Sequence, residues 1–199
     1  MTARFLATAV FCGLLVSGPL PSSAISASSC AALRAWAVSY EHSTPTLDEL
    51  AGFDRAHRRA IFTAVSPGVR AALWREQIRR LGAQPDLTAT QHALTVEAIG
   101  LLTPALYLHE PQATAAFQEF RQRAERAFVT FAHQRAWTDL GALSGTDARQ
   151  AHADVDYCNC KIGGGTGQCG GVSCVSGPCE LIWGCGFSGV ETCNGLCQW

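Results

Sequence analysis

The chain has 199 residues, 48% of them hydrophobic and 16% charged, with a formal net charge of −1, which fits one or two small folded domains and not a disordered chain. The near balance of 15 basic and 16 acidic residues lacks the positive excess by which proteins bind nucleic acid or an anionic membrane surface. Eight of the ten cysteines lie in the last 42 residues. We therefore expect two regions of different construction.

Residues 1–24 have the layout of a secretory signal peptide. Arg4 precedes an apolar run from Phe5 to Val16, and prolines and small residues follow up to Ala24. The run is too short for a membrane-spanning helix, which needs about 20 apolar residues, and no stable membrane span is expected elsewhere. We expect a secreted protein, whose cysteines form disulfides in an oxidising compartment. Lipid anchoring at Cys30 is a minor alternative to a buried thiol there.

Residues 25–143 are predicted to form an all-α, propeptide-like unit. Short helices are expected over 31–40 and 54–65. Ser66 and Pro67 have the types preferred at the first positions of a helix, and apolar residues then recur every three or four positions until Gly82. Thr88 and Gln91 match a capping box that begins the next helix, which Pro104 ends. About 115 residues of this pattern can bury a core unaided.

The last helix of this unit is expected to begin at Glu110-Pro111 and to turn one apolar stripe toward the core. The stripe comprises Ala113, Phe117, Phe120, Ala124, Ala127, Phe128 and Phe131. The arginines of the unit alternate with acids along the chain. We interpret both arginine clusters as solvated helix faces, namely Arg55, Arg58 and Arg59, and Arg75, Arg79 and Arg80.

The helical unit offers no recognisable chemistry. No two of the six histidines stand three or four residues apart, so no helical metal pair is available. The sequence contains no HExxH, GxSxG or P-loop motif. We predict no catalytic residue, no metal site and no cofactor, and we do not expect an enzyme.

Residues 144–157 are polar and are predicted to be a linker that a processing protease cuts. Residues 158–199 are predicted to be a small disulfide-rich domain of loops and short strands. This region has too few large apolar side chains for a stable core and therefore needs disulfides to hold its fold. Metal binding is disfavoured, since this region has no C-x-x-C motif and no histidine. Connectivity stays open among 105 pairings of eight cysteines. The cysteines are Cys158, Cys160, Cys169, Cys174, Cys179, Cys185, Cys193 and Cys197.

Large aromatic groups in a scaffold this small are expected to lie partly on the surface. We predict that Trp183, Phe187 and Trp199 are candidates for contact with a target. The tail has one lysine and two glutamates, which is unlike a cationic membrane-disrupting peptide. The expected partner is a protein or another component of a bacterial cell surface.

The order of the cysteines resembles the fulvocin C-related family of bacteriocin precursors. The resemblance lies in the C-x-C opening at Cys158, in Gly184-Cys185-Gly186 and in the closing Cys193-Asn194-Gly195-Leu196-Cys197. A second similarity lies upstream, in Trp36, Pro45 to Glu49, Arg58 to Phe62 and Leu73 to Arg75. The resemblance as a whole implies a secreted precursor with an antibacterial, disulfide-bonded C-terminal peptide.

The leading hypothesis is a secreted bacteriocin-like precursor whose stapled tail is active after release from the helical propeptide. The alternative is an uncleaved secreted protein with a disulfide-rich binding or inhibitor module. The role of the helical unit stays open among chaperoning, keeping the tail inactive and self-immunity.

Overall fold

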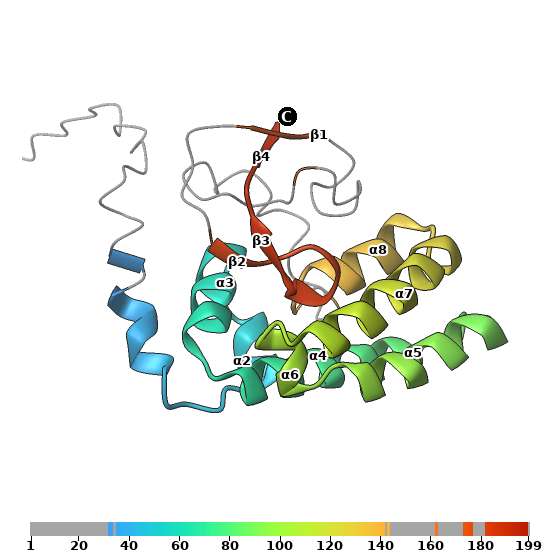
Figure 1. Ribbon diagram of the computed structural model, residues 1–199. Coiled ribbons are helices and arrows are strands. Elements are labelled where there is room, and N and C mark those ends of the chain that lie inside the picture. Colours follow the sequence, from blue (N-terminus) through green and yellow to red (C-terminus); the bar gives the residue numbers. More distant parts are fainter. Residues whose placement is uncertain are drawn as a thin grey trace, which may run out of the picture.

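The protein is described by a computed structural model over residues 32–33, 35–141, 143, 162, 173–176 and 182–198. Helices form most of this part, and short strands follow near the C-terminus, which confirms the predicted fold class (Figure 1). The predicted signal peptide, Cys30 and the predicted linker lie outside these residues. Among the described helices, none has the length and apolar character needed to cross a membrane.

The helices follow the predicted order. They include the 3-10 helix η1, α2 (Leu47–Ala51), α3 (Arg55–Ala64), α4 (Pro67–Gly82), α5 (Ala89–Leu101), α6 (Pro104–Tyr107), α7 (Pro111–Ala127) and α8 (Phe131–Thr138). Helix η1 (Val38–Tyr40) ends the first predicted helical segment. The Ser66 side chain accepts a hydrogen bond from Val69 N at the start of α4, and Thr88 and Gln91 form both bonds of the predicted capping box. These caps satisfy backbone N–H groups that a helix start leaves unpaired.

The helices differ from the sequence prediction in three places, one of which is α6, a short helix at the proline that was expected only to end the preceding helix. Helix α2 was not predicted, although Thr46 and Glu49 form a full capping box at its start. The stripe assigned to one helix up to Phe131 is divided, because the chain leaves helical geometry at Phe128 (φ −104°, ψ 71°). Thr130 then caps α8, whose first residue is Phe131. The prediction of a continuous helix was therefore wrong at its C-terminal end.

Helix α4 is central to the helical unit. It contacts α2, α5, α6 and α8, while α7 packs on α5 and α6. Its Trp74 and Ile78 are buried. The buried Gln77 amide donates to the carbonyls of Ala136 (2.6 Å) and Asp139 (3.0 Å) and accepts from Gly141 N. Gln77 thereby fixes the C-terminal end of α8 against α4.

The described tail contains two antiparallel pairs of strands. Strand β1 (Ser173–Val175) pairs with β4 (Leu196–Gln198), and β2 (Ile182–Cys185) pairs with β3 (Glu191–Cys193). A bulge interrupts the second pair between Trp183 and Cys185, and a short 3-10 turn, η5 (Phe187–Gly189), joins its strands. Figure 1 shows β2 and β3 next to the helices, with β1 and β4 farther away.

Candidate functional site

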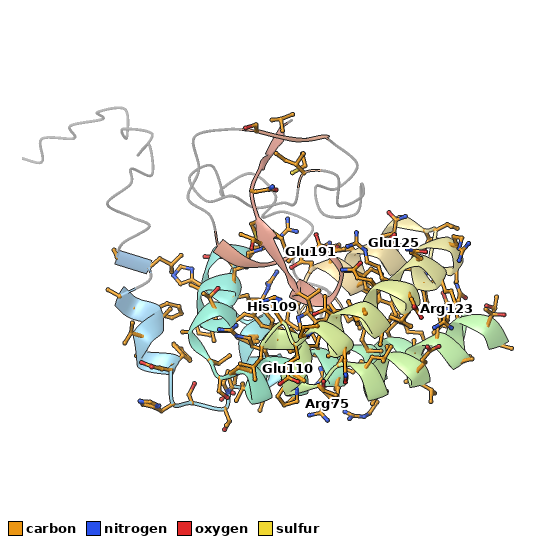
Figure 2. The ribbon with its side chains drawn as sticks, in the orientation of Figure 1. Arg75, His109, Glu110, Arg123, Glu125 and Glu191 are labelled. Carbon is orange, nitrogen blue, oxygen red and sulfur yellow. A yellow bond between two sulfur atoms is a disulfide. The ribbon has the colours of Figure 1, made fainter. Side chains whose placement is uncertain are left out.

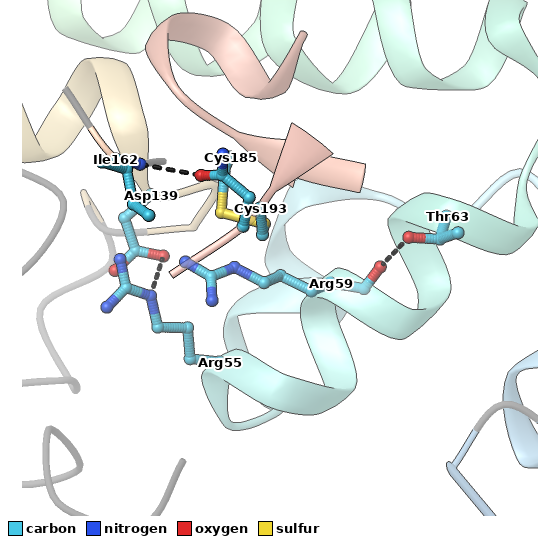
Figure 3. The surroundings of a disulfide bond; sticks show 8 residues. Arg55, Arg59, Thr63, Asp139, Ile162, Cys185 and Cys193 are labelled. Carbon is cyan, nitrogen blue, oxygen red and sulfur yellow. Dashed lines mark hydrogen bonds and ion pairs between the residues drawn. A yellow bond between two sulfur atoms is a disulfide. The ribbon is translucent and has the colours of Figure 1, made fainter. Parts of the chain in front are cut away.

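Residues 182–193, here called the tail hairpin, are closed by a disulfide between two of the eight cysteines that were predicted to form disulfides. Cys185 and Cys193 are bonded to each other, and both are buried (Figure 3). Cys174 is also disulfide-bonded. Four predicted disulfide cysteines lie outside the described residues, as does Trp199, and the structure describes the backbone but not the side chains of Trp183 and Cys197. Those four are Cys158, Cys160, Cys169 and Cys179.

The tip of the tail hairpin has an unusual backbone. Gly186, Ser188 and Gly189 all have positive φ angles, of 72°, 55° and 65°. Left-handed geometry favours glycine because a Cβ crowds the backbone there. The tight turn places Phe187 at the end of the hairpin, two residues after the disulfide-bonded Cys185.

Phe187 is inside the hydrophobic core, with 4% of its surface exposed. Its ring stacks on Trp137 with centroids 4.5 Å apart and lies 6.2 Å from the centroids of Phe117 and Phe120. The prediction that Phe187 is available to a target was therefore wrong for the intact chain. We call the buried aromatic side chains that face Phe187 or its neighbours in the hairpin the aromatic socket. They are Phe62, Trp74, Tyr107, Phe117, Phe120 and Trp137.

Two glycines let the hairpin backbone approach the socket closely. A Cβ at Gly189 would lie 2.8 Å from Trp74 Nε1 and 3.2 Å from the Phe62 ring. A Cβ at Gly184 would lie 3.3 Å from the same Phe62 ring. The fit therefore depends on glycine for space as well as for backbone conformation.

One hydrogen bond joins the socket to the hairpin backbone. The Tyr107 hydroxyl donates to the carbonyl of Ser188 at 3.1 Å, and both residues are buried. Burial raises the pKa of Tyr107 well above its ordinary value, while Arg70 and Arg75 offset part of this effect. The hydroxyl therefore keeps its proton and remains a donor.

An ion pair lies at the edge of this contact. Arg121 of α7 pairs with Glu191 of β3, and the two side chains are 15% and 14% exposed. Arg121 also pairs with Glu125 one helical turn away, at 2.6 Å. Figure 2 shows Glu191 and Glu125 on the same side of the molecule. An aromatic centre with a charged rim is the usual anatomy of a protein interface.

A second contact region surrounds Asp139, just after α8. Its carboxylate lies 3.3 Å from Arg58 Nη2, 3.7 Å from Arg55 Nε and 3.6 Å from Arg135 Nε. Figure 3 shows Arg55 and Arg59 of α3 extending toward Asp139, beside the hairpin disulfide. Burial raises the pKa of Asp139, but the arginines Arg55, Arg58, Arg59 and Arg135 lower it by more, so the pKa is below its ordinary value.

The interpretation of the first arginine cluster as a solvated face was therefore wrong for Arg58 and Arg59, which are 2% and 7% exposed. The spacing of apolar residues in the sequence could have predicted the burial of Arg58. Arg58 precedes Ile61, Phe62 and Val65 by three, four and seven residues, so in a helix it lies on the same buried face. Of the second cluster, Arg79 is exposed and pairs with Glu76, as expected for a surface helix face.

The site is closed and offers little room for a small molecule. The cavity lined by Arg55, Arg59, Asp139 and Gly184 has a volume of about 10 Å³, enough for about one water. Within the described part of the chain, no group of three His, Cys, Asp or Glu side chains is placed to hold a metal ion. What the geometry provides is a matched contact between a stapled loop and an aromatic socket.

No protein-family model matches the chain, and no curated protein or solved structure matches it.

Proposed function

We propose that the chain is a secreted precursor of the fulvocin C-related kind, in which residues 158–199 become an antibacterial peptide. A signal peptide over 1–24 directs export, a helical propeptide over 25–143 carries the tail, and a protease cuts within 144–157. The observation that carries the proposal is the burial of Phe187 in the aromatic socket. A tail whose main aromatic tip is covered must leave the helical unit before it can contact a target.

The hairpin disulfide supports the same proposal. Cys185 and Cys193 close the loop covalently, so the loop stays closed when the helical unit is removed. A closed loop loses less conformational entropy when it binds than an open chain does. Release would thus expose Phe187 at the tip of a constrained loop, where an aromatic ring can fill a pocket on a protein partner.

The charge of the tail indicates how it would act. Lys161, Glu180 and Glu191 are its only charged side chains. Binding to anionic lipid by basic residues needs several of them, at about 1 kcal/mol each. We therefore propose recognition of a bacterial surface component by shape and apolar contact.

The test is to secrete the full chain with a specific protease site placed within 144–157. The folded protein is cut and its two parts are separated in denaturant without reductant, so that the disulfides stay intact. The tail is then refolded by dilution and assayed for growth inhibition on a panel of related bacteria. We expect inhibition by the separated tail and none by the uncut chain. An inactive tail with intact disulfides would contradict the proposal.

The second candidate is the uncleaved binding or inhibitor module. It is favoured by one observation, that Phe187 and Val190 complete the core of the helical unit as residues of a permanently joined protein would. The intact mass of the naturally secreted protein separates the two candidates. A single species lacking only the signal peptide would support the uncleaved module.

A further inference from the structure

The contact between the tail hairpin and the helical unit does not depend on the linker. Helices α3, α4, α6, α7 and α8 each supply at least one side chain that meets the hairpin directly. Cutting within 144–157 breaks none of these contacts. The two parts thus have the geometry of a complex whose partners are joined by a tether.

We propose that the helical unit is a binding module for its own tail and keeps the hairpin bound after cleavage, as a stoichiometric inhibitor. The ligand it fits is a disulfide-closed loop with a phenylalanine between left-handed glycine and serine positions. Its biological role rests on the proposed function, while the binding itself does not. Cleavage alone then leaves the tail inactive, and the tail becomes active only as it slowly dissociates from the helical unit.

The centre of the contact supplies the affinity. Interfaces draw most of their binding energy from a few fully desolvated residues, among which aromatic anchors are prominent. Phe187 is 4% exposed and stacks on Trp137, which is itself 0% exposed. The Cys185–Cys193 disulfide restricts the loop before it binds, which lowers the entropic cost of association.

The tip geometry supplies the specificity. A Cβ at Gly189 would lie 2.8 Å from Trp74 Nε1 and 3.2 Å from the Phe62 ring, so a larger residue there would clash with Trp74 and crowd Phe62. The Tyr107 hydroxyl donates a hydrogen bond to the backbone carbonyl of Ser188, a residue held at a positive φ by this turn. The socket therefore selects the hairpin conformation in addition to its phenylalanine.

The experiment uses the full folded chain with a protease site in the linker and a capture tag at the mature N-terminus. A Cys30→Ser background excludes a disulfide between the two parts. The protein is immobilised by the tag, cut and washed, and the rate at which the tail leaves is measured by mass spectrometry. Phe187→Ala tests the anchor. Tyr107→Phe tests a single bond and preserves the core, with Tyr40→Phe as its matched control because Tyr40 packs on Trp36 and Phe53.

We expect the cut wild-type protein to retain its tail through extended washing. Loss of a buried phenylalanine should speed departure by about 100-fold or more, and loss of one buried hydrogen bond by about 5- to 10-fold. Tyr40→Phe should match the wild type. Immediate loss of the wild-type tail would overturn the proposal, and so would equal retention in Tyr107→Phe and the wild type.

Retention is measured without reference to killing, so the two proposals can fail separately. A tail that stays bound but never inhibits growth would contradict only the proposed function. A tail that inhibits growth but leaves as soon as the linker is cut would contradict only the inhibitor role.

Discussion

Replacing Asp139 with asparagine removes the negative charge at the centre of the arginine cluster. Arg58 is 2% exposed and cannot regain water without a rearrangement, whereas Arg55 and Arg135 are 21% and 27% exposed and can be resolvated. Breaking a buried ion pair by removing one partner costs about 3–5 kcal/mol. Because asparagine can still accept a hydrogen bond from Arg58, we expect the lower end, about 3 kcal/mol of unfolding free energy.

The pH dependence of the stability loss in Asp139→Asn distinguishes the effect of the lost charge from an effect on packing. The pKa of Asp139 is lowered in the folded protein, so its stabilising effect is fully present above its unfolded pKa, about 3.8. The effect is lost as the pH falls through the lower, folded value. The difference between wild type and Asp139→Asn should therefore be large at pH 7 and shrink below about pH 4. The pKa values of Asp48, Glu49 and Glu76 are also lowered, but they are common to both proteins and cancel in this difference.

The assay is urea unfolding at several pH values in 0.5 M salt, followed by tryptophan fluorescence. Asp48→Asn is the matched control, because the Asp48 side chain is 72% exposed and its pair with Arg80 is screened by salt. It should leave the unfolding midpoint nearly unchanged at pH 7. A loss in Asp139→Asn that is the same at pH 7 and pH 3 would refute the electrostatic reasoning. So would a loss of less than about 1 kcal/mol at pH 7.

Three further substitutions test the hairpin and its support, each by urea unfolding of the uncut chain. Gly189→Ala should lower the unfolding free energy by about 2–4 kcal/mol, because of the positive φ and because a Cβ there would crowd Trp74. Gly100→Ala, where a Cβ would meet nothing within 4 Å, should raise it by about 0.5–1 kcal/mol. A change of the same sign in both variants would contradict the assigned contact. Ser188→Gly should stabilise the fold by about 0.5–1 kcal/mol, because it relieves a positive φ and removes a buried hydroxyl that has no hydrogen-bond partner within the described residues. A clear loss of stability would show that the hydroxyl does have a hydrogen-bond partner. Gln77→Leu should cost about 2–4 kcal/mol, because three backbone groups of α8 and the following turn lose their partner; a neutral result would mean that these groups find water.

Local chemistry made the helix starts predictable. Ser66, Thr88 and Glu110 each directly precede a helix, because capping residues and a proline at the first helical position act over three or four residues and are visible in sequence. The break at Phe128 was missed because the apolar stripe continues across it. The start of α8 is marked by the Thr130 cap, whose side chain accepts a hydrogen bond from His133 N.

The candidate site was less predictable, because its parts are distant in the chain. Phe187 and Trp137 are brought together by the whole helical unit, and no local pattern indicates that a tail phenylalanine stacks on that tryptophan. The predicted disulfide framework gave Cys185 and Cys193 as members but could not pair them. Exposure of Phe187 was inferred from the small size of the tail alone, and it fails because the helical unit provides the core that the tail lacks.

The change of composition near residue 143 is therefore not a boundary of the hydrophobic core. Trp137, Phe117 and Phe120 are each 0% exposed, and all three have Phe187 as a ring neighbour. Removing the hairpin would expose part of each aromatic surface, just as it would expose Phe187. Both parts then carry a complementary apolar patch that water disfavours, which draws them back together. The same burial that would keep a tail inactive in the precursor would make its release the slow step of activation.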